Sequence, residues 1–519
     1  MRLLRINFVQ ARVLLVQAGA VFAATALVAG CGYNYRPVVT PINPTGPPAQ
    51  PSSYAVTVSA PLSTTPGVVP PGVATIIDYS GDTVMASALI GPGPTTFTMD
   101  TTGSTGYTIN SDHTLTNFPV SVTGNGSLQP KNINYTTLPT TAQPVNLFSP
   151  SAGLWAADLT GNVVDLFSGF PQTFLRSIPL APTPVMIVGS NGGSGRDFAI
   201  SQGNSQGGNV SSNVACNLSP ATVSVNGEVD AIDTSSATIT SRIAAGKCPV
   251  FAITSTDARR LFVLNRGSDT VTVIDVPNNT LDSCTGLVNQ AGQPVTCHPT
   301  LPLSLTAVNA LNAVKAGSGN PPNGTTGITN VAGPVYAEYN AATSQLIVAN
   351  YDGATISLID VSMDVYGNDS PTFGTTFTIP VGNNPASVTA LVDGSRAYTA
   401  NQADGTVTIV NLNSHTVEKT LPVTGFPRTV VSTQNSIQGK IYVGSPNSPY
   451  LTIIRTDQDI VGASVLLEGH LVDVRVTTQN GVSGNPNFGS RIPGYGQPCN
   501  LHPTVMGGSY TLVDCQKQP

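Results

Sequence analysis

The residues that could take part in catalysis are few and scattered. The chain of 519 residues contains five histidines, and no two of them lie at the spacing of metal ligands. They are His113, His298, His415, His470 and His502. The H-E-x-x-H metal motif and the phosphate-binding loop are both absent from the sequence. The sequence therefore indicates no candidate catalytic residue, and it predicts neither a metal site nor a cofactor.

The beginning of the chain has the features of an export signal. Arginines and no acidic residues accompany an apolar run over Val13–Gly30, and Cys31 follows the run directly. This junction resembles the lipobox of bacterial lipoproteins, which implies cleavage after residue 30 and a lipid on Cys31. Gly32, in place of aspartate, implies sorting to the outer membrane. The alternative is an uncleaved transmembrane anchor, because the run is nearly long enough to span a bilayer.

Composition divides the rest of the chain. Residues 31–72 are rich in Pro, Ser and Thr, which predicts a disordered tether, and residues 73–519 are predicted to form the folded body. Only 9% of the residues are charged, and the formal net charge is −6. A net acidic chain without a basic cluster is not expected to bind nucleic acid.

Three segments of the body align without gaps, over residues 261–276, 346–361 and 397–412. Each consists of a β-rich run, an asparagine and a second β-rich run. The asparagines are Asn265, Asn350 and Asn401. Asparagine is expected there because its side chain can mimic a backbone turn and it tolerates left-handed dihedrals.

A proline lies twelve residues before each of these segments, at Pro249, Pro334 and Pro385. Proline suits the first residue of a strand. Weaker copies of the unit follow four more prolines, Pro94, Pro144, Pro184 and Pro427. One unit is therefore four short strands: a after the proline, b before the asparagine, c after it, and d leading to the next proline. Four strands per unit of about 40–50 residues are typical of a β-propeller blade.

These units resemble the YVTN-type propeller repeat, which is named for its strand b. Here that strand reads Phe262–Asn265, Ile347–Asn350 and Tyr398–Asn401. The resemblance implies a fold, and it implies almost nothing about function. Asp275 and Asp360 recur at the end of strand c, where we expect them to cap the following turn.

The predicted fold is all-β, a single β-propeller of seven or eight four-stranded blades. Seven units begin with a proline. Two strand-like runs precede the first unit, over residues 74–90, and two follow the last, over residues 472–513. Joined, these ends would make an eighth blade, so the repeat count favours eight. In the alternative there are seven blades, with one end as an embellishment.

Long insertions are expected near residues 203–225, between strands b and c, near 282–326, between c and d, and near 478–508. Six cysteines remain besides Cys31, and no C-x-x-C pattern occurs. In an exported chain they indicate disulfides, with 15 possible connectivities. Loops b–c and d–a emerge on one face of a propeller, so cysteines in these two loops can meet. Within a single insertion, disulfides are favoured between cysteines that are close in sequence. These considerations favour the pairs Cys216–Cys248, Cys284–Cys297 and Cys499–Cys515.

Two classes of function remain. The first is a non-catalytic binding or scaffolding propeller of the cell envelope, anchored to the membrane by its lipid. The alternative is an enzyme similar to the lactone hydrolases, which need converging Arg, His and carboxylate groups that this chain has in short supply. For the binding function we expect a site in the b–c loops, and the partner to be an envelope protein or a polar polymer. The alternative is that these loops are ordinary solvated turns. The candidate ligand-binding residues are Arg266, Asp269, Tyr351, Asp352, Gln402 and Asp404.

Overall fold

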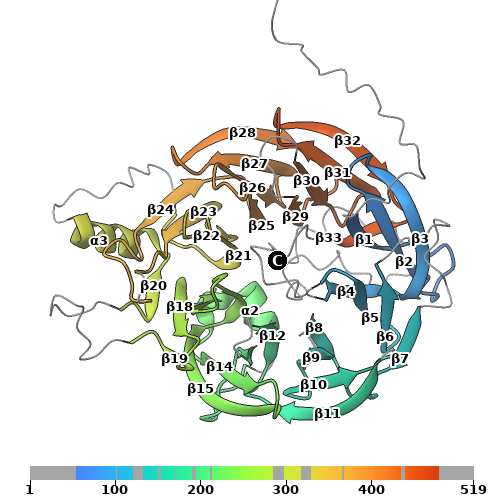
Figure 1. Cartoon of the computed structure of the whole chain (residues 1–519), viewed down its shortest axis with the longest axis horizontal. Helices are drawn as coiled ribbons and strands as arrows, with labels where there is room; N and C mark the ends of the chain where they lie inside the picture. Colours follow the sequence, from blue (N-terminus) through green and yellow to red (C-terminus); the bar gives the residue numbers. More distant parts are fainter. Residues whose placement is uncertain are drawn as a thin grey trace, which may run out of the picture. The chain divides into compact units, whose positions relative to one another are not determined.

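Short β-strands make up most of the part of the chain that the structure describes. A computed structural model describes residues 54–477 apart from 101, 121–132, 150–152, 170, 190–194, 211–212, 284–296, 317–328, 365–366 and 434–438. Its strands form eight sheets, arranged as blades around a central axis (Figure 1). The predicted all-β propeller is confirmed, and the number of blades is eight.

Each blade is an antiparallel meander, with strand a innermost and strand d at the rim (Figure 1). The first two blades after Pro94 consist of β4 (Pro94–Met99), β5 (Thr105–Asn110), β6 (Thr114–Pro119) and β7 (Asn134–Thr137), and of β8 (Pro144–Phe148), β9 (Leu154–Asp158), β10 (Val163–Ser168) and β11 (Thr173–Pro179). The third consists of β12 (Pro184–Gly189), β13 (Arg196–Ser201), β14 (Asn226–Asp233) and β15 (Thr238–Lys247). The fourth consists of β16 (Pro249–Thr254), β17 (Arg260–Asn265), β18 (Thr270–Asp275), β19 (Thr280–Leu281) and β20 (Thr300–Pro302). The next three blades consist of β21 (Pro334–Asn340), β22 (Gln345–Asn350), β23 (Thr355–Asp360) and β24 (Thr376–Pro380); β25 (Pro385–Ala390), β26 (Arg396–Asn401), β27 (Thr406–Asn411) and β28 (Thr416–Pro422); and β29 (Thr429–Ser432), β30 (Lys440–Gly444), β31 (Tyr450–Arg455) and β32 (Ile460–Leu466). Six of these seven blades begin strand a with a proline, as predicted.

The remaining blade closes the ring with strands from both ends of the described chain. From inside to outside it contains β33 (His470–Val476), β1 (Tyr54–Ala60), β2 (Pro71–Asp78) and β3 (Thr83–Pro92). The predicted union of the two ends is confirmed.

The identity of its second strand was predicted wrongly. β1 comes from the segment assigned to the tether, and it takes the position that had been given to residues 509–513. Six of its seven residues are buried, so the ordered body begins before residue 73. The predicted insertion near 478–508, and Cys499 and Cys515, lie outside the described residues.

The two ends of the described chain lie side by side. The backbone N–H of Tyr54 donates to Oγ1 of Thr477 (2.7 Å), and the N–H of Thr477 donates to the carbonyl of Tyr54 (2.8 Å). Strand a runs from the face of the d–a loops to the face of the a–b loops, and strand b runs back. Both ends therefore lie on the face of the a–b and c–d connections.

The asparagine that ends strand b ties strand b to strand c. Nδ2 of Asn401 donates to the hydroxyls of Thr406 (3.0 Å) and Thr408 (2.7 Å). The same pair of bonds recurs at Asn110, Asn265 and Asn350. The expected left-handed turn role was wrong, because none of these asparagines has a positive φ. A Cβ on Gly382 would lie 2.7 Å from the amide of Asn401, which explains the small residue before the next proline.

The acidic residues at the end of strand c cap the next turn, as predicted. Oδ1 of Asp275 accepts the N–H of Asn278 (3.1 Å), and Oδ1 of Asp360 accepts the N–H of Ser362 (2.9 Å). Their recurrence therefore has a structural cause.

The two described insertions are arranged differently. Residues 203–225 connect β13 to β14, as predicted, and include α2 (Asn213–Leu218) and the 3-10 helix η2 (Pro220–Thr222). The insertion expected between strands c and d over 282–326 was placed wrongly. It starts inside strand d, because β19 and β20 both pair with β18 and the chain leaves the sheet between them. A second excursion follows β20 and contains α3 (Leu305–Ala316).

Helix α3 covers the edge of a neighbouring blade. Nδ2 of Asn312 donates to the carbonyl of Thr376 (2.7 Å), and the N–H of Thr376 donates back to Oδ1 of Asn312 (3.1 Å). Thr376 begins β24, the outermost strand of its sheet. Pairing the free groups of an edge strand protects it from pairing with other chains.

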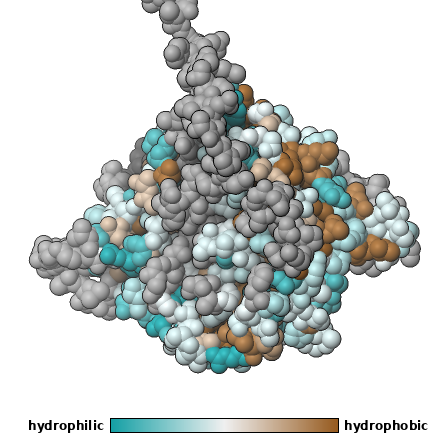
Figure 2. Space-filling model, turned by 45° about the vertical axis from the view of Figure 1, so that its right-hand side comes forward, coloured by the Kyte–Doolittle hydropathy of each residue, from teal (hydrophilic) through white to brown (hydrophobic). Residues whose placement is uncertain are grey.

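Burial follows the position of a strand within its blade. Every residue of β16 and β17 is buried, because each sheet packs between two others. Most residues of the rim strands β11 and β28 are exposed. Figure 2 shows apolar side chains, in brown, at the surface on the side that carries β3. Within the described residues, no helix is long and apolar enough to cross a membrane.

Candidate functional site

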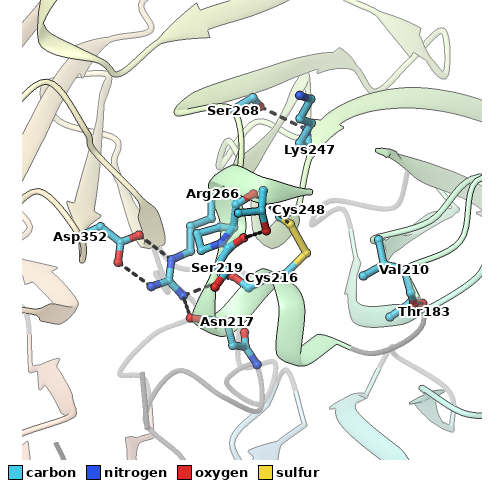
Figure 3. The surroundings of a disulfide bond; sticks show 12 residues. Thr183, Val210, Cys216, Asn217, Ser219, Lys247, Cys248, Arg266, Ser268 and Asp352 are labelled. Atoms are coloured by element: carbon cyan, nitrogen blue, oxygen red, sulfur yellow. Dashed lines mark hydrogen bonds and ion pairs between the residues drawn. A yellow bond between two sulfur atoms is a disulfide. The ribbon is translucent and has the colours of Figure 1, made fainter. Parts of the chain in front are cut away.

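Arg266 is the centre of a polar network on the face of the b–c and d–a connections (Figure 3). It follows β17, and only 3% of its surface is exposed. Its guanidinium donates from Nε to Oδ2 of Asp352 (2.7 Å) and from Nη2 to Oδ1 (2.6 Å). Such a two-point ion pair fixes the relative position of its partners. It joins the b–c loops of two neighbouring blades.

Tyr351 extends this network to a third blade. The guanidinium carbon of Arg266 lies 5.3 Å from the centre of the Tyr351 ring, which is a cation–π contact. The hydroxyl of Tyr351 donates to Oε1 of Gln402 (3.3 Å) in the next b–c loop. Burial raises the pKa of Tyr351 to about 12, so the hydroxyl keeps its proton at neutral pH.

The two other candidate carboxylates hold d–a connections. Oδ1 of Asp269 accepts the N–H groups of Ala332 (3.2 Å) and Gly333 (2.7 Å). Asp404 accepts the N–H and the side-chain amide of Asn383 (2.7 and 2.9 Å). Burial is the main cause that raises the pKa of Asp269. Both carboxylates therefore order the loops of this face.

The insertion over residues 203–225 is fastened to the same network. A disulfide joins Cys216 in α2 to Cys248, which directly precedes β16, with an S–S distance of 2.07 Å (Figure 3). This pair was predicted and is confirmed. Nη1 of Arg266 donates to the carbonyl of Asn217 (2.9 Å). Oγ1 of Thr183, before β12, donates to the carbonyl of Val210 (2.6 Å).

The structure thus brings Arg266, Tyr351, Asp352 and Gln402 into contact, with Asp269 and Asp404 nearby in the same set of loops. The sequence predicted these residues as candidates, but it did not predict that Arg266, Tyr351 and Gln402 are buried. Because they bond to one another, they form a rigid scaffold for the rim, and their role in binding a ligand stays a prediction.

A second cluster lies where the chain leaves strand d. Nη2 of Arg260 lies 3.0 Å from Oδ1 of Asp282 and 3.5 Å from Oδ1 of Asp369. Nδ1 of His298 lies 2.7 Å from Oδ2 of Asp369, and its ring stacks on Phe373. Burial, together with the neighbouring Asp369, raises the pKa of Asp282 to about 6. The sequence offered no signal for this cluster, because Arg260 and Asp369 are 109 residues apart.

This cluster does not fit a metal ion. Ligand atoms of Asp282, Cys297 and Asp369 lie within 4.8 Å of one another. Cys297, however, is disulfide-bonded and offers no thiolate, and Arg260 already supplies a cation to both carboxylates. Its predicted partner Cys284, like Cys31, lies outside the described residues.

One motif was missed by the sequence analysis. Residues 203–207 match the G-x-S-x-G pattern of a nucleophile elbow. The hydroxyl of Ser205 donates to Oε2 of Glu228 (2.7 Å), and Ser205 lies in a loop turn that is separated from both β13 and α2, not at a direct strand-to-helix turn. The segment therefore lacks the elbow geometry that would activate a serine.

No family model matches this chain, and no curated protein matches it in sequence. Solved structures that resemble it include apo AztD from Citrobacter koseri, at 11% identity and a TM-score of 0.50, covering 82% of this chain and 97% of that one. Another is the dihydro-heme d1 dehydrogenase NirN, at 11% identity and a TM-score of 0.52, covering 83% and 77%. A third is a putative 6-phosphogluconolactonase from Bacteroides fragilis, at 11% identity and a TM-score of 0.44, covering 83% and 99%. At these identities the likeness shows the fold alone, and the chain is a β-propeller protein.

Proposed function

We propose that this chain is a lipid-anchored propeller of the cell envelope, built from YVTN-type repeats, that acts as a non-catalytic binding or scaffolding protein. Its ligand would contact the face of the b–c and d–a connections. The lipid on Cys31 and the outer-membrane location rest on the signal sequence. The ligand class, an envelope protein or a polar polymer, rests on the polar groups of that face.

The observation that carries the proposal is that the insertion over residues 203–225 is held in place on this face by a disulfide and by hydrogen bonds. Loops on a rigid scaffold are common recognition sites, and ordering them before binding lowers the entropic cost of association. The disulfide between Cys216 and Cys248 and the bonds from Arg266 and Thr183 hold the insertion at three points. Such fastening keeps an exposed surface in one shape.

The chemistry of the network favours binding over catalysis. Arg266 and Asp352 neutralise each other, and the raised pKa of Tyr351 leaves almost no phenolate at neutral pH to act as a base. The alternative, a hydrolase that acts on lactones, is tested by incubating the purified protein with a set of sugar lactones. Turnover that survives repurification would favour this alternative.

The anchor is tested on the purified N-terminal peptide by mass spectrometry. We expect cleavage after Gly30 and added acyl mass on Cys31, and release of Cys31→Ser protein from membranes, because the acyl chains provide the attachment. An unmodified peptide that spans residues 1–31 would contradict the anchor.

The binding face is tested by blocking it without disturbing the fold. Ala221 in η2 is exposed, so Ala221→Arg adds bulk and charge to the face. Gln458, exposed in the c–d turn on the opposite face, gives the matched control Gln458→Arg. After affinity purification of the intact lipoprotein in detergent, the Ala221 variant should lose its co-purifying partner and the Gln458 variant should keep it. Equal retention by both would contradict the choice of face.

A further inference from the structure

Three apolar side chains are more than half exposed beside the Arg266 network. Val214 and Leu218 are 51% and 55% exposed, and Val331 is 53% exposed. Val214 and Leu218 are four residues apart in α2, so they project from the same side of it. Val331 belongs to the d–a connection before β21. We call these three residues the α2 surface.

Bonds around one ion pair bring the two parts of the α2 surface together. Asn217, next to Leu218, accepts a hydrogen bond from Arg266 through its carbonyl. Arg266 bonds to Asp352, and Gly353 donates its N–H to the carbonyl of Ala332 (2.9 Å), beside Val331. The backbone segments that carry these apolar groups are therefore both linked to the ion pair between Arg266 and Asp352.

The surroundings hold these side chains at the surface. The disulfide fixes α2 to the base of β16, and Asp269 fixes Ala332 and Gly333. These bonds fix the backbone on which the apolar side chains stand. Several exposed apolar side chains grouped on an ordered backbone are a common feature of protein contact sites.

The charges of this region point to an uncharged partner. Residues 203–225 contain no charged side chain. Arg266 and Asp352 neutralise each other, and Asp269 accepts two backbone N–H groups. Figure 3 shows the ammonium group of Lys247 directed away from α2.

The aromatic ring of the network argues against a sugar ligand at this place. Sugar rings commonly stack on exposed aromatic faces, and Tyr351 is buried with Arg266 against its ring. An apolar protein segment, in contrast, can bury Val and Leu side chains directly.

We infer that the α2 surface binds an uncharged, apolar segment of another envelope protein. This inference rests on the proposed binding function and selects a protein over a polar polymer. The contact would bury Val214, Leu218 and Val331, while Arg266 and the disulfide position them.

The experiment uses the intact lipoprotein in its own cells. A photocrosslinking benzoyl-phenylalanine replaces Leu218, and in a control strain it replaces Val84, which is 47% exposed on β3 at the rim. We expect a protease-sensitive adduct from position 218 and none of the same size from position 84. Val214→Ser together with Val331→Ser should lower its yield about tenfold, because such contacts are worth 1–2 kcal/mol at an interface. Mass spectrometry should place the crosslink in an apolar, uncharged segment of a different protein.

Each other result overturns the inference in a recognisable way. A glycan or lipid adduct, an adduct to this chain itself, or a yield unchanged by the two serine substitutions would each refute it. If one of these results is found while a partner still co-purifies and Ala221→Arg removes it, the proposed function stands and this inference fails. If no partner co-purifies and no adduct forms, both fail.

Discussion

Replacing Arg266 with alanine should destabilise the ring by about 2–4 kcal/mol. Breaking a buried ion pair by removing one partner costs roughly 3–5 kcal/mol, because the other charge is left uncompensated. The Arg266 side chain is 2% exposed and that of Asp352 is 27% exposed, so water can partly solvate the remaining carboxylate. The loss of the bond to the buried carbonyl of Asn217 adds to the cost. We therefore place the effect slightly below the range for a fully buried pair.

The assay is thermal unfolding of the soluble Cys31→Ser protein under oxidising conditions. Unfolding entropy is about 2.1 cal/mol/K per residue, so for roughly 400 ordered residues the midpoint should fall by about 2–5 °C. A double-mutant cycle with Asp352→Ala should show a coupling of about 1–3 kcal/mol. These magnitudes also mean that Arg266→Ala is unsuitable as a binding-only variant.

Arg259 provides the matched control. Its side chain is 44% exposed, and its Nε lies 3.7 Å from Asp257. Arg259→Ala should change stability by less than about 0.5 kcal/mol, as is usual for surface ion pairs. Equal unfolding midpoints for the Arg266 and Arg259 variants, or strict additivity in the cycle with Asp352, would refute the conclusion that the ion pair between Arg266 and Asp352 stabilises the ring.

Three further predictions concern the frame of the ring. Asn401→Leu removes two hydrogen bonds between strands and should cost about 1–3 kcal/mol, measured as a lower urea midpoint; an unchanged midpoint would show that the bonds contribute nothing net. Ending the chain before His470 removes β33, exposes the edge of β1 and should abolish the single unfolding transition, whereas a chain ending at Thr477 keeps all four strands of that blade; a parent-like melt of the shorter chain would contradict closure by β33. The raised pKa of Asp282, about 6, means that its protonated form is favoured in the folded state, so its contribution is present below about pH 4 and is lost as the pH rises through 6. Midpoints measured between pH 4 and 7 should therefore fall more for the parent than for Asp282→Asn, and parallel curves would count against this assignment.

The repeat made the architecture predictable. A proline at or shortly before strand a marks seven units, and an asparagine ends strand b in four of them, so these seven blades could be located from local pattern. β1 was missed because Tyr54–Ala60 is short and lies among Pro, Ser and Thr residues. Its burial comes from pairing with β33, more than 400 residues away, which no local pattern reports.

The candidate site was predictable in its location but not in its energetics. The disulfide between Cys216 and Cys248 followed from loops that share a face. A charged residue in a loop is expected to be solvated, and the burial of Arg266 depends on Asp352, 86 residues further along the chain. The joint role of Arg260 and Asp369 was hidden for the same reason, because their contact depends on the packing of two blades.

The adjacency of Tyr54 and Thr477 shows at which face of the ring the proposed tether would be attached. Both residues lie on the face of the a–b and c–d connections, whereas Arg266 and α2 lie on the other. With a lipid on Cys31, the connecting segment reaches at most about 75 Å, since an extended chain spans about 3.3 Å per residue. Because this attachment point and α2 lie on opposite faces of the ring, the tether would leave the ring from the face that does not carry the α2 surface.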